Sequence, residues 1–167
     1  MRRKLSTTAA ALAFATTTAL SGVVTAAGTA VAADTDPVVL IAEPSVREQA
    51  DQIMSLTYRE FASTPRVEPF NWTTDGCSVP TGFAPYSEVF RPACVQHDFG
   101  YRNYGAHHEL KLSPTRETKN WIDSRFRTEM ERVCQDTYVT PLAHMNCVNA
   151  AQAYHVAVSF GGDPAFF

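Results

Sequence analysis

A short stretch near the middle of the chain, CVQHDFGYRNY (residues 94–104), places a histidine directly before a carboxylate. On a helix, Cys94, His97 and Tyr101 share one face because they are three and four residues apart. Asp98 points about 100° away around the same helix. We therefore expect His97 and Asp98 to act on different groups: a neutral imidazole can take a proton from water, and a carboxylate can hold a hard cation.

Further oxygen ligands for such a cation stand just upstream, in NWTTDGCSVP (residues 71–80). Asp75 offers a carboxylate, and Gly76 lets the backbone turn so that a carbonyl or an amide faces the ion. Ligation by oxygen atoms alone at an extracellular site favours calcium over zinc or copper. Asp75, Gly76 and Asp98 are therefore the candidate protein ligands of a Ca²⁺ ion.

A histidine that acts as general base needs a carboxylate on its other ring nitrogen, which fixes the tautomer and stabilises the imidazolium. Downstream, KNWIDSRF offers Asp123, which follows the apolar residues Trp121 and Ile122 and is expected on the inward side of its helix. Glu117 and Glu129 are competitors in more charged surroundings, the former near Lys119. We therefore expect Asp123 to support His97.

The N-terminus has the pattern of a secretory signal peptide. Arg2, Arg3 and Lys4 precede a long uncharged stretch that ends in small residues at positions 30–32. Thr, Ser and Gly dilute this stretch, which argues against a transmembrane helix. We therefore divide the chain into a signal peptide at residues 1–33 and one exported domain at residues 34–167.

The exported part is acidic. Without Arg2, Arg3 and Lys4, the 14 Lys and Arg of the whole chain become 11, against 17 Asp and Glu, which gives a formal charge of −6. Nucleic-acid binding depends on clustered cations that neutralise phosphates, and the sequence has no run of Lys or Arg. We therefore exclude nucleic acid as a partner.

All four cysteines lie in the exported part: Cys77, Cys94, Cys134 and Cys147. An even number of cysteines in an oxidising compartment predicts two disulfides, and four cysteines allow three pairings. Zinc is disfavoured because no close Cys-x-x-Cys pair is present to start a tetrahedral site.

The spacing of apolar residues predicts four helices to carry these groups. Ser45 and Glu48 form a capping box that opens the first, of about sixteen residues. After an irregular stretch from Pro65 to Pro92, the second has Pro92 in its first turn and ends at Gly105.

The third helix is expected to open with Ser113 as its cap and Pro114 as its first residue. Its apolar stripe is formed by Trp121, Ile122, Phe126, Met130 and Val133. The fourth begins near Pro141 and stops at Gly161–Gly162. Strand signals are weak and no repeat is visible, so we expect a small all-α helical bundle with one long ordered loop before its second helix.

The stretch CVQHDFGYRNY resembles the active-site helix of secreted phospholipase A2, in which a Cys precedes a His-Asp pair and a Tyr follows the His by four residues. With NWTTDGCS upstream and WIDSRF downstream, residues 45–160 are similar to the small prokaryotic and fungal branch of that superfamily, as found in streptomycete secreted enzymes. The resemblance implies a disulfide-stapled helical bundle of the phospholipase A2 type, with an irregular calcium-binding loop before the active-site helix.

The resemblance also implies an activity: calcium-dependent hydrolysis of the sn-2 acyl ester of glycerophospholipids to a lysophospholipid and a free fatty acid. His97 would activate water, Asp123 would support His97, and Tyr101 would orient Asp123 through its hydroxyl. The implied protein ligands of Ca²⁺ are Asp75, Asp98 and the backbone carbonyl of Gly76. The implied disulfides are Cys77–Cys94 and Cys134–Cys147.

A phospholipase of this kind would be a secreted monomer that meets a membrane or micelle surface transiently. The candidate anchors, which are equally candidate pocket or core residues, are Phe83, Tyr86, Val89, Phe90 and the terminal residues Pro164, Ala165, Phe166 and Phe167. The remaining histidines are expected to be surface or packing residues: His107, His108, His144 and His155.

Two other functions compete with this hypothesis. The first is a non-catalytic module that binds calcium and lipid on the same scaffold. The joint presence of a base, a supporting carboxylate and calcium ligands argues against it, because an inactive relative is expected to lack one of them. A secreted structural protein would leave the adjacent His97 and Asp98 unexplained.

Overall fold

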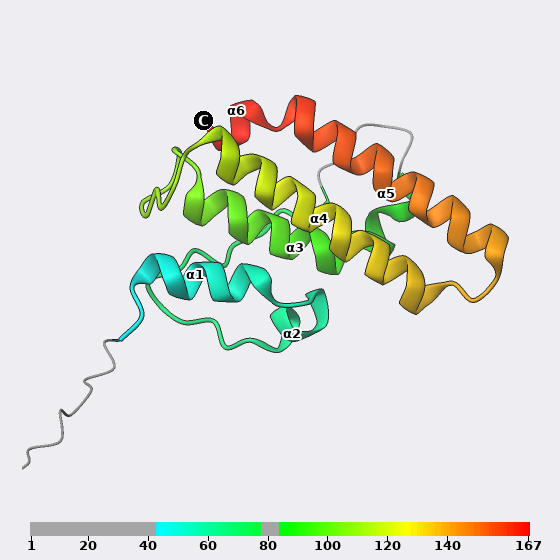
Figure 1. Cartoon of the computed structure of the whole chain (residues 1–167), viewed down its shortest axis with the longest axis horizontal. Helices are drawn as coiled ribbons and strands as arrows, with labels where there is room; N and C mark the ends of the chain where they lie inside the picture. The colour runs from blue at the N-terminus through cyan, green and yellow to red at the C-terminus, as the bar shows by residue number, and fades with distance from the viewer. Residues whose placement is uncertain (1–42, 78–83) are drawn as a thin grey trace, which may run out of the picture. The chain divides into compact units, whose positions relative to one another are not determined.

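The computed structural model describes residues 43–77 and 84–167, and every regular element within these ranges is helical. In chain order they are α1 (Val46–Ser55), α2 (Tyr58–Ser63), a 3-10 turn (Ala84–Tyr86), α3 (Ser87–Tyr104), α4 (Arg116–Thr137), α5 (Pro141–Gly161) and α6 (Asp163–Phe166). Figure 1 shows α3, α4 and α5 packed side by side. The predicted all-α bundle is confirmed, and the predicted signal peptide and Phe83 lie outside the described residues.

The expected first helix is two helices, α1 and α2. The predicted capping box stands at the start of α1, but a second capping box, between Thr57 and Glu60, starts α2. The prediction of one helix was wrong because the apolar spacing runs on across Thr57, which itself signals a new helix N-terminus. The carbonyl of Leu56 at the break accepts hydrogen bonds from Gln96 and Arg125, both at 2.8 Å, so the end of α1 is satisfied by side chains.

The helix α3 begins five residues earlier than predicted, so Pro92 lies inside it rather than in its first turn. Pro92 has no N–H to bond the carbonyl four residues back, which costs α3 one hydrogen bond near its N-terminus. The additional turn is held by Phe90, whose buried ring lies 5.1 Å from that of Tyr154. The helix ends at the predicted glycine, Gly105.

The helix α4 begins two residues later than expected, because Thr115 replaces Ser113 as its cap and accepts a hydrogen bond from the third helical N–H. The helix α5 begins and ends at the predicted residues. The short helix α6, which follows Gly162, was not predicted.

Two disulfides connect these elements. Cys134–Cys147 joins α4 to α5, with 5.7 Å between the two Cα atoms. Cys77–Cys94 ties the irregular segment before α3 to α3 itself, with 5.3 Å between the Cα atoms. Both pairings implied by the resemblance are therefore present.

Two groups of buried side chains lie between the helices. One joins α3, α4 and α5 and includes Phe90, Phe126, Met130, Val133 and Tyr154. The other joins α1, α2, α3, α4 and α6 and includes Met54, Phe99, Tyr104, Ile122 and Phe166. Four members of the predicted stripe on α4 are buried, whereas Trp121 is half-buried against the ring of Tyr104.

The helices α3 and α4 approach each other closely at Gly100. A Cβ atom there would lie 2.8 Å from Cγ2 of Ile122, so a larger residue would push the two helices apart. Gly100 and Ile122 are each close in sequence to a candidate catalytic residue, His97 and Asp123. The close approach therefore brings those two side chains within reach of each other.

Candidate active site

The helices α3 and α4 hold His97 against Asp123. The Nε2 atom of His97 lies 2.9 Å from Oδ1 of Asp123, and both side chains are buried. When Nε2 carries the proton and donates it to the carboxylate, the lone pair stands on Nδ1. His97 also lines a cavity, so it has an orienting carboxylate on one side and room for water nearby.

Of the three carboxylates weighed from the sequence, Asp123 is the one in contact with His97. Glu117 is exposed in the first turn of α4. Glu129 is buried, but its partners are Arg125 at 2.8 Å, Arg132 at 3.3 Å and the backbone N–H of Tyr58 at 2.9 Å. Glu129 therefore holds the start of α2 and takes no part in the site.

The Asp123 carboxylate has donors on both oxygens. The Tyr101 hydroxyl donates to Oδ1 at 2.8 Å, and Nζ of Lys119 donates to Oδ2 at 2.7 Å. Burial by itself raises the pKa of Asp123, but the hydrogen bonds and charges of His97, Lys119 and Tyr101 outweigh burial and hold the pKa below its ordinary value. Asp123 is therefore ionised at neutral pH and can stabilise an imidazolium.

The Tyr101 ring lies beside His97 and its hydroxyl serves Asp123. The ring centroids of Tyr101 and Phe126 lie 4.2 and 4.6 Å from that of His97. Burial and the neighbouring Asp123 raise the pKa of Tyr101 far above its ordinary value. The hydroxyl therefore keeps its proton and remains a donor.

Lys119 belongs to the site and was missed by the sequence reasoning, which grouped it with a charged stretch. Its side chain is fully buried, and Nζ also lies 2.9 Å from the carbonyl oxygen of Val158 on α5. The available signal was the four-residue spacing of Lys119 and Asp123 on one helix. That spacing does not reveal that the end of α5 covers the lysine.

The irregular segment before α3 brings Asp75 beside Asp98. The backbone N–H of Asp75 and the hydroxyl of Thr74 both donate to Oδ2 of Asp98, at 3.2 and 2.5 Å. Gly76 has a φ of 77°, a left-handed conformation that favours glycine. The Cys77–Cys94 disulfide then fixes the next residue of the segment to α3.

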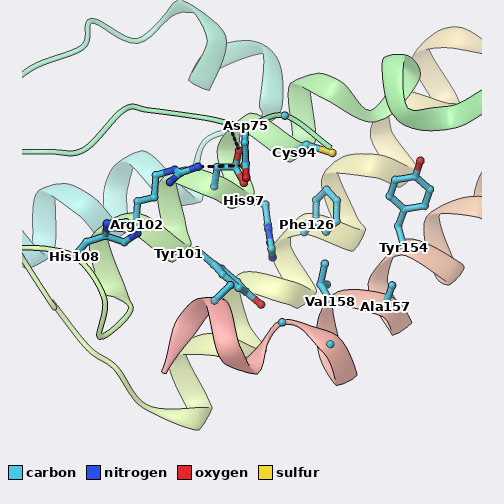
Figure 2. A pocket seen from close by; sticks show the side chains of 15 residues that line it. Asp75, Cys94, His97, Tyr101, Arg102, His108, Phe126, Tyr154, Ala157 and Val158 are labelled. Carbon is cyan, nitrogen blue, oxygen red and sulfur yellow. Dashed lines mark hydrogen bonds and ion pairs between the residues drawn. The ribbon is translucent and has the colours of Figure 1, made fainter. Parts of the chain in front are cut away.

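The two acidic side chains differ in their surroundings. Asp75 is 66% exposed, and Nη2 of Arg102 lies 3.1 Å from its Oδ1 (Figure 2). Burial raises the pKa of Asp98, the hydrogen bond from Thr74 opposes this, and the negative charge of Asp75 raises the pKa further. A cation next to both carboxylates would relieve that repulsion.

The oxygen atoms here suit a hard cation such as Ca²⁺. In residues 43–77 and 84–167, no three side chains of His, Cys, Asp or Glu group together as metal ligands. Two carboxylates and the carbonyls of a glycine turn nevertheless make an oxygen-only donor set, which calcium accepts when water completes its shell. The residues of this segment therefore fit calcium by their chemistry.

A cavity of about 750 Å³ connects the base and the acidic pair. In Figure 2, Asp75, Arg102 and His108 lie toward one side of it, and Tyr154, Ala157 and Val158 toward the other. His108 was expected to have no part in a site, yet it lines this cavity, and burial together with Arg102 and His107 lowers its pKa. The cavity thus has a polar side and an apolar side.

The other histidines lie apart from this arrangement. Nε2 of His107 contacts the carbonyl oxygen of Pro164 at 3.1 Å, and His144 and His155 are half-buried on α5. None of these three lines the cavity.

Comparison with known proteins identifies the class of the chain. The model of a family described as prokaryotic phospholipase A2 matches residues 51–162, a range that runs from within α1 to the end of α5. This range contains the His97–Asp123 pair, the Asp75–Asp98 pair and both disulfides. The chain belongs to the prokaryotic phospholipase A2 family.

A curated relative comes from the fungus Beauveria bassiana (strain ARSEF 2860) and is named secretory phospholipase A2. It is 33% identical to this chain over 111 residues, which are 64% of this chain and 52% of the relative. The chain therefore spans about half the length of the curated relative that it matches.

Proposed function

We propose that this protein is a secreted, calcium-dependent phospholipase A2 that hydrolyses the sn-2 acyl ester of glycerophospholipids to a lysophospholipid and a free fatty acid. The observation that carries the proposal is the 2.9 Å contact between His97 and Asp123 at a cavity that Asp98 also lines. A base can activate the water for ester hydrolysis, and a cation held at the same cavity can stabilise the negative charge that develops on the carbonyl oxygen.

In this mechanism His97 takes a proton from a water molecule through Nδ1, and the water oxygen attacks the sn-2 carbonyl carbon. Asp123 stabilises the imidazolium, while Tyr101 and Lys119 donate hydrogen bonds to the two carboxylate oxygens of Asp123. The imidazolium returns the proton to the glycerol oxygen as the ester bond breaks. The fatty acid leaves with the oxygen of the water, and no covalent acyl-enzyme is formed.

The proposed protein ligands of calcium are Asp75, Asp98 and the carbonyl of Gly76. Calcium, when bound, would supply positive charge for the lipid phosphate and for the carbonyl oxygen that becomes negative. Arg102 pairs with Asp75 at 3.1 Å, so binding of the ion competes with this pair. Two carboxylates give a weak site. We expect a dissociation constant for calcium on the order of 10⁻⁴ M, as in extracellular modules, rather than the tighter values of cytosolic sensors.

The apolar side of the cavity suits an acyl chain. Its walls come from α4 and α5, through Phe126, Tyr154, Ala157 and Val158. A buried chain there would place its ester near His97, which lines the same cavity.

The substrate is part of a lipid surface, so we also propose transient binding to membranes or micelles. The helix α5 contains no Asp, Glu, Lys or Arg, and its Leu142 and Phe160 side chains are 65% and 85% exposed. Burial of exposed apolar side chains in a lipid surface is favourable. Of the anchors considered from the sequence, Phe90 and Phe166 are fully buried, whereas Phe167 is 40% exposed.

The two disulfides support a protein that works outside the cell, because disulfides persist in oxidising compartments. The basic and apolar pattern of residues 1–33 supports export by a signal peptide. No helix in the described part of the chain is long and apolar enough to cross a bilayer. We propose that the exported protein acts as a monomer.

The test is fatty-acid release from a phosphatidylcholine with distinguishable sn-1 and sn-2 chains, with calcium and with a chelator. The proposal expects release of the sn-2 chain with calcium and loss of release with the chelator. The alternative, a non-catalytic module for calcium and lipid, expects calcium-dependent vesicle binding without fatty acid. Release of the sn-1 chain would assign a different ester bond.

A further inference from the structure

The fully buried ammonium group of Lys119 is the least expected charge in the molecule. Lysine is almost never fully buried unless it is paired, so each partner of Nζ matters. These partners are Oδ2 of Asp123 at 2.7 Å, the carbonyl oxygens of Val158 at 2.9 Å and Ser159 at 3.5 Å, and Oδ1 of Asp163 at 3.6 Å. The ammonium is thus surrounded by oxygen atoms from α4, from the last turn of α5 and from α6.

Lys119 contacts the carboxylate oxygen of Asp123 that is not bonded to His97. Oδ1 of Asp123 faces both His97 and Tyr101, and Oδ2 faces Lys119. A carboxylate held at both oxygens cannot rotate, so the direction in which Oδ1 meets the imidazole is fixed. Lys119 also balances the negative charge of Asp123 in a place that water does not reach.

We propose that Lys119 is a positioning residue that acts on His97 through Asp123. This inference rests on the proposed function and assigns to the reaction a residue that is separated from the reacting water by Asp123 and His97. It also links the base to the far end of the chain, because Asp163, the more distant partner of Lys119, forms a two-point ion pair with Arg116 at 2.6 and 2.7 Å. Alternating charges thus run from Asp123, the partner of His97, through Lys119 and Asp163 to Arg116.

A purely structural role would look different. In that case Lys119 would only fasten α4 to the end of α5, and its loss would lower stability without changing the reaction. The chain offers a matched comparison in Arg125, another cation on α4. Arg125 also pairs with a carboxylate four residues on, Glu129, and binds the backbone carbonyls that end a helix, here α1.

The experiment compares Lys119→Met with Arg125→Met in kcat and KM on a monomeric short-chain phosphatidylcholine at saturating calcium. We expect Lys119→Met to lower kcat about tenfold or more and to leave KM within about twofold of the parent value. This loss is a part of the rate enhancement of about 10² to 10⁴ that a well-placed base contributes. Arg125→Met should lose stability in urea and keep its kcat. Equal kcat values for the two variants would overturn the proposal.

A double-variant cycle shows whether the effect passes through Asp123. In an Asp123→Asn background, adding Lys119→Met should not lower kcat by more than about twofold, because residues that act as a unit are not additive. It can raise kcat, because the amide oxygen is then no longer drawn away from His97 by Lys119. Multiplicative losses would mean that Lys119 acts by another path, against the proposal.

A second readout does not need turnover. The ¹⁵N spectrum of the His97 ring should show a changed Nε2–H signal in Lys119→Met and an unchanged one in Arg125→Met. If the parent protein releases no fatty acid, the proposed function fails, and this spectrum still decides the role of Lys119. If Lys119→Met does not fold, Lys119→Gln, which keeps a neutral donor, takes its place; failure of both to fold would assign Lys119 a structural role and overturn the proposal.

Discussion

Replacing Asp123 with Asn tests how the site controls the proton on His97. An amide has one oxygen and one NH₂ group, so it cannot accept hydrogen bonds on both sides as the carboxylate does. Lys119 competes for the single oxygen with a charge-assisted hydrogen bond, which is about twice as strong as a neutral one. The amide oxygen therefore turns to Lys119, and the NH₂ group faces His97 and Tyr101.

With a donor against Nε2, the imidazole carries its proton on Nδ1 and cannot take another from water. The variant should lose most of what a placed base contributes, about 10²- to 10⁴-fold in kcat. KM should change little, because Asp123 does not line the cavity. The free energy of unfolding should fall by about 3 kcal/mol, since Lys119 is left buried with its main counter-charge removed.

The assay measures kcat and KM on a monomeric short-chain phosphatidylcholine at saturating calcium, and unfolding in urea. The ¹⁵N spectrum of the imidazole reports which nitrogen carries the proton. The matched control is Glu129→Gln, a buried carboxylate on the same helix that pairs with Arg125 and lies away from the cavity. It should lose stability and keep kcat. A kcat of Asp123→Asn within about threefold of the parent, with the proton still on Nε2, would refute the reasoning.

Three further predictions follow from the same geometry. His97→Ala should abolish hydrolysis and keep calcium affinity in calorimetry, whereas Asp98→Asn should weaken calcium binding first; the reverse pattern would exchange their roles. Phe160→Ser should lower binding to phosphatidylcholine vesicles about tenfold, since burying a Phe is worth roughly 1.5–3 kcal/mol, and should leave hydrolysis of a monomeric substrate unaffected. The comparison is Val139→Ser, which removes another exposed apolar side chain, 96% exposed, outside α5. Equal effects of the two substitutions would argue against a defined anchor. The pKa of Asp123 is lowered in the folded protein, so its ionisation contributes stability above the unfolded pKa of about 3.9, and this stability is lost as pH falls through the lower folded pKa. The parent should therefore melt at a higher temperature than Asp123→Asn at neutral pH and lose this advantage below about pH 4. A difference in melting temperature that stays constant with pH would contradict this assignment.

The parts of the site that sequence could predict are those set by local spacing. The separation of four residues puts His97 and Tyr101 on one face of the helix, and both side chains reach Asp123. Glycine at position 76 was read as a turn and has a positive φ. These features depend on one helix or one turn, so periodicity and residue type were enough.

The features that were missed depend on contacts between distant segments. The burial of Lys119 follows from where α5 ends, and the pairing of Arg102 with Asp75 joins residues that are far apart in sequence. The break before α2 is a different case, because the Thr57–Glu60 capping box was visible in the sequence but was outweighed by a continuing apolar pattern.

The measurement that bears most directly on the whole account is a side-by-side assay of the parent and folded His97→Ala on phosphatidylcholine with two distinguishable chains, at saturating calcium. An imidazole that activates water predicts sn-2 fatty acid from the parent and almost none from the variant. Equal release by the two proteins would show that the ester is cleaved without His97.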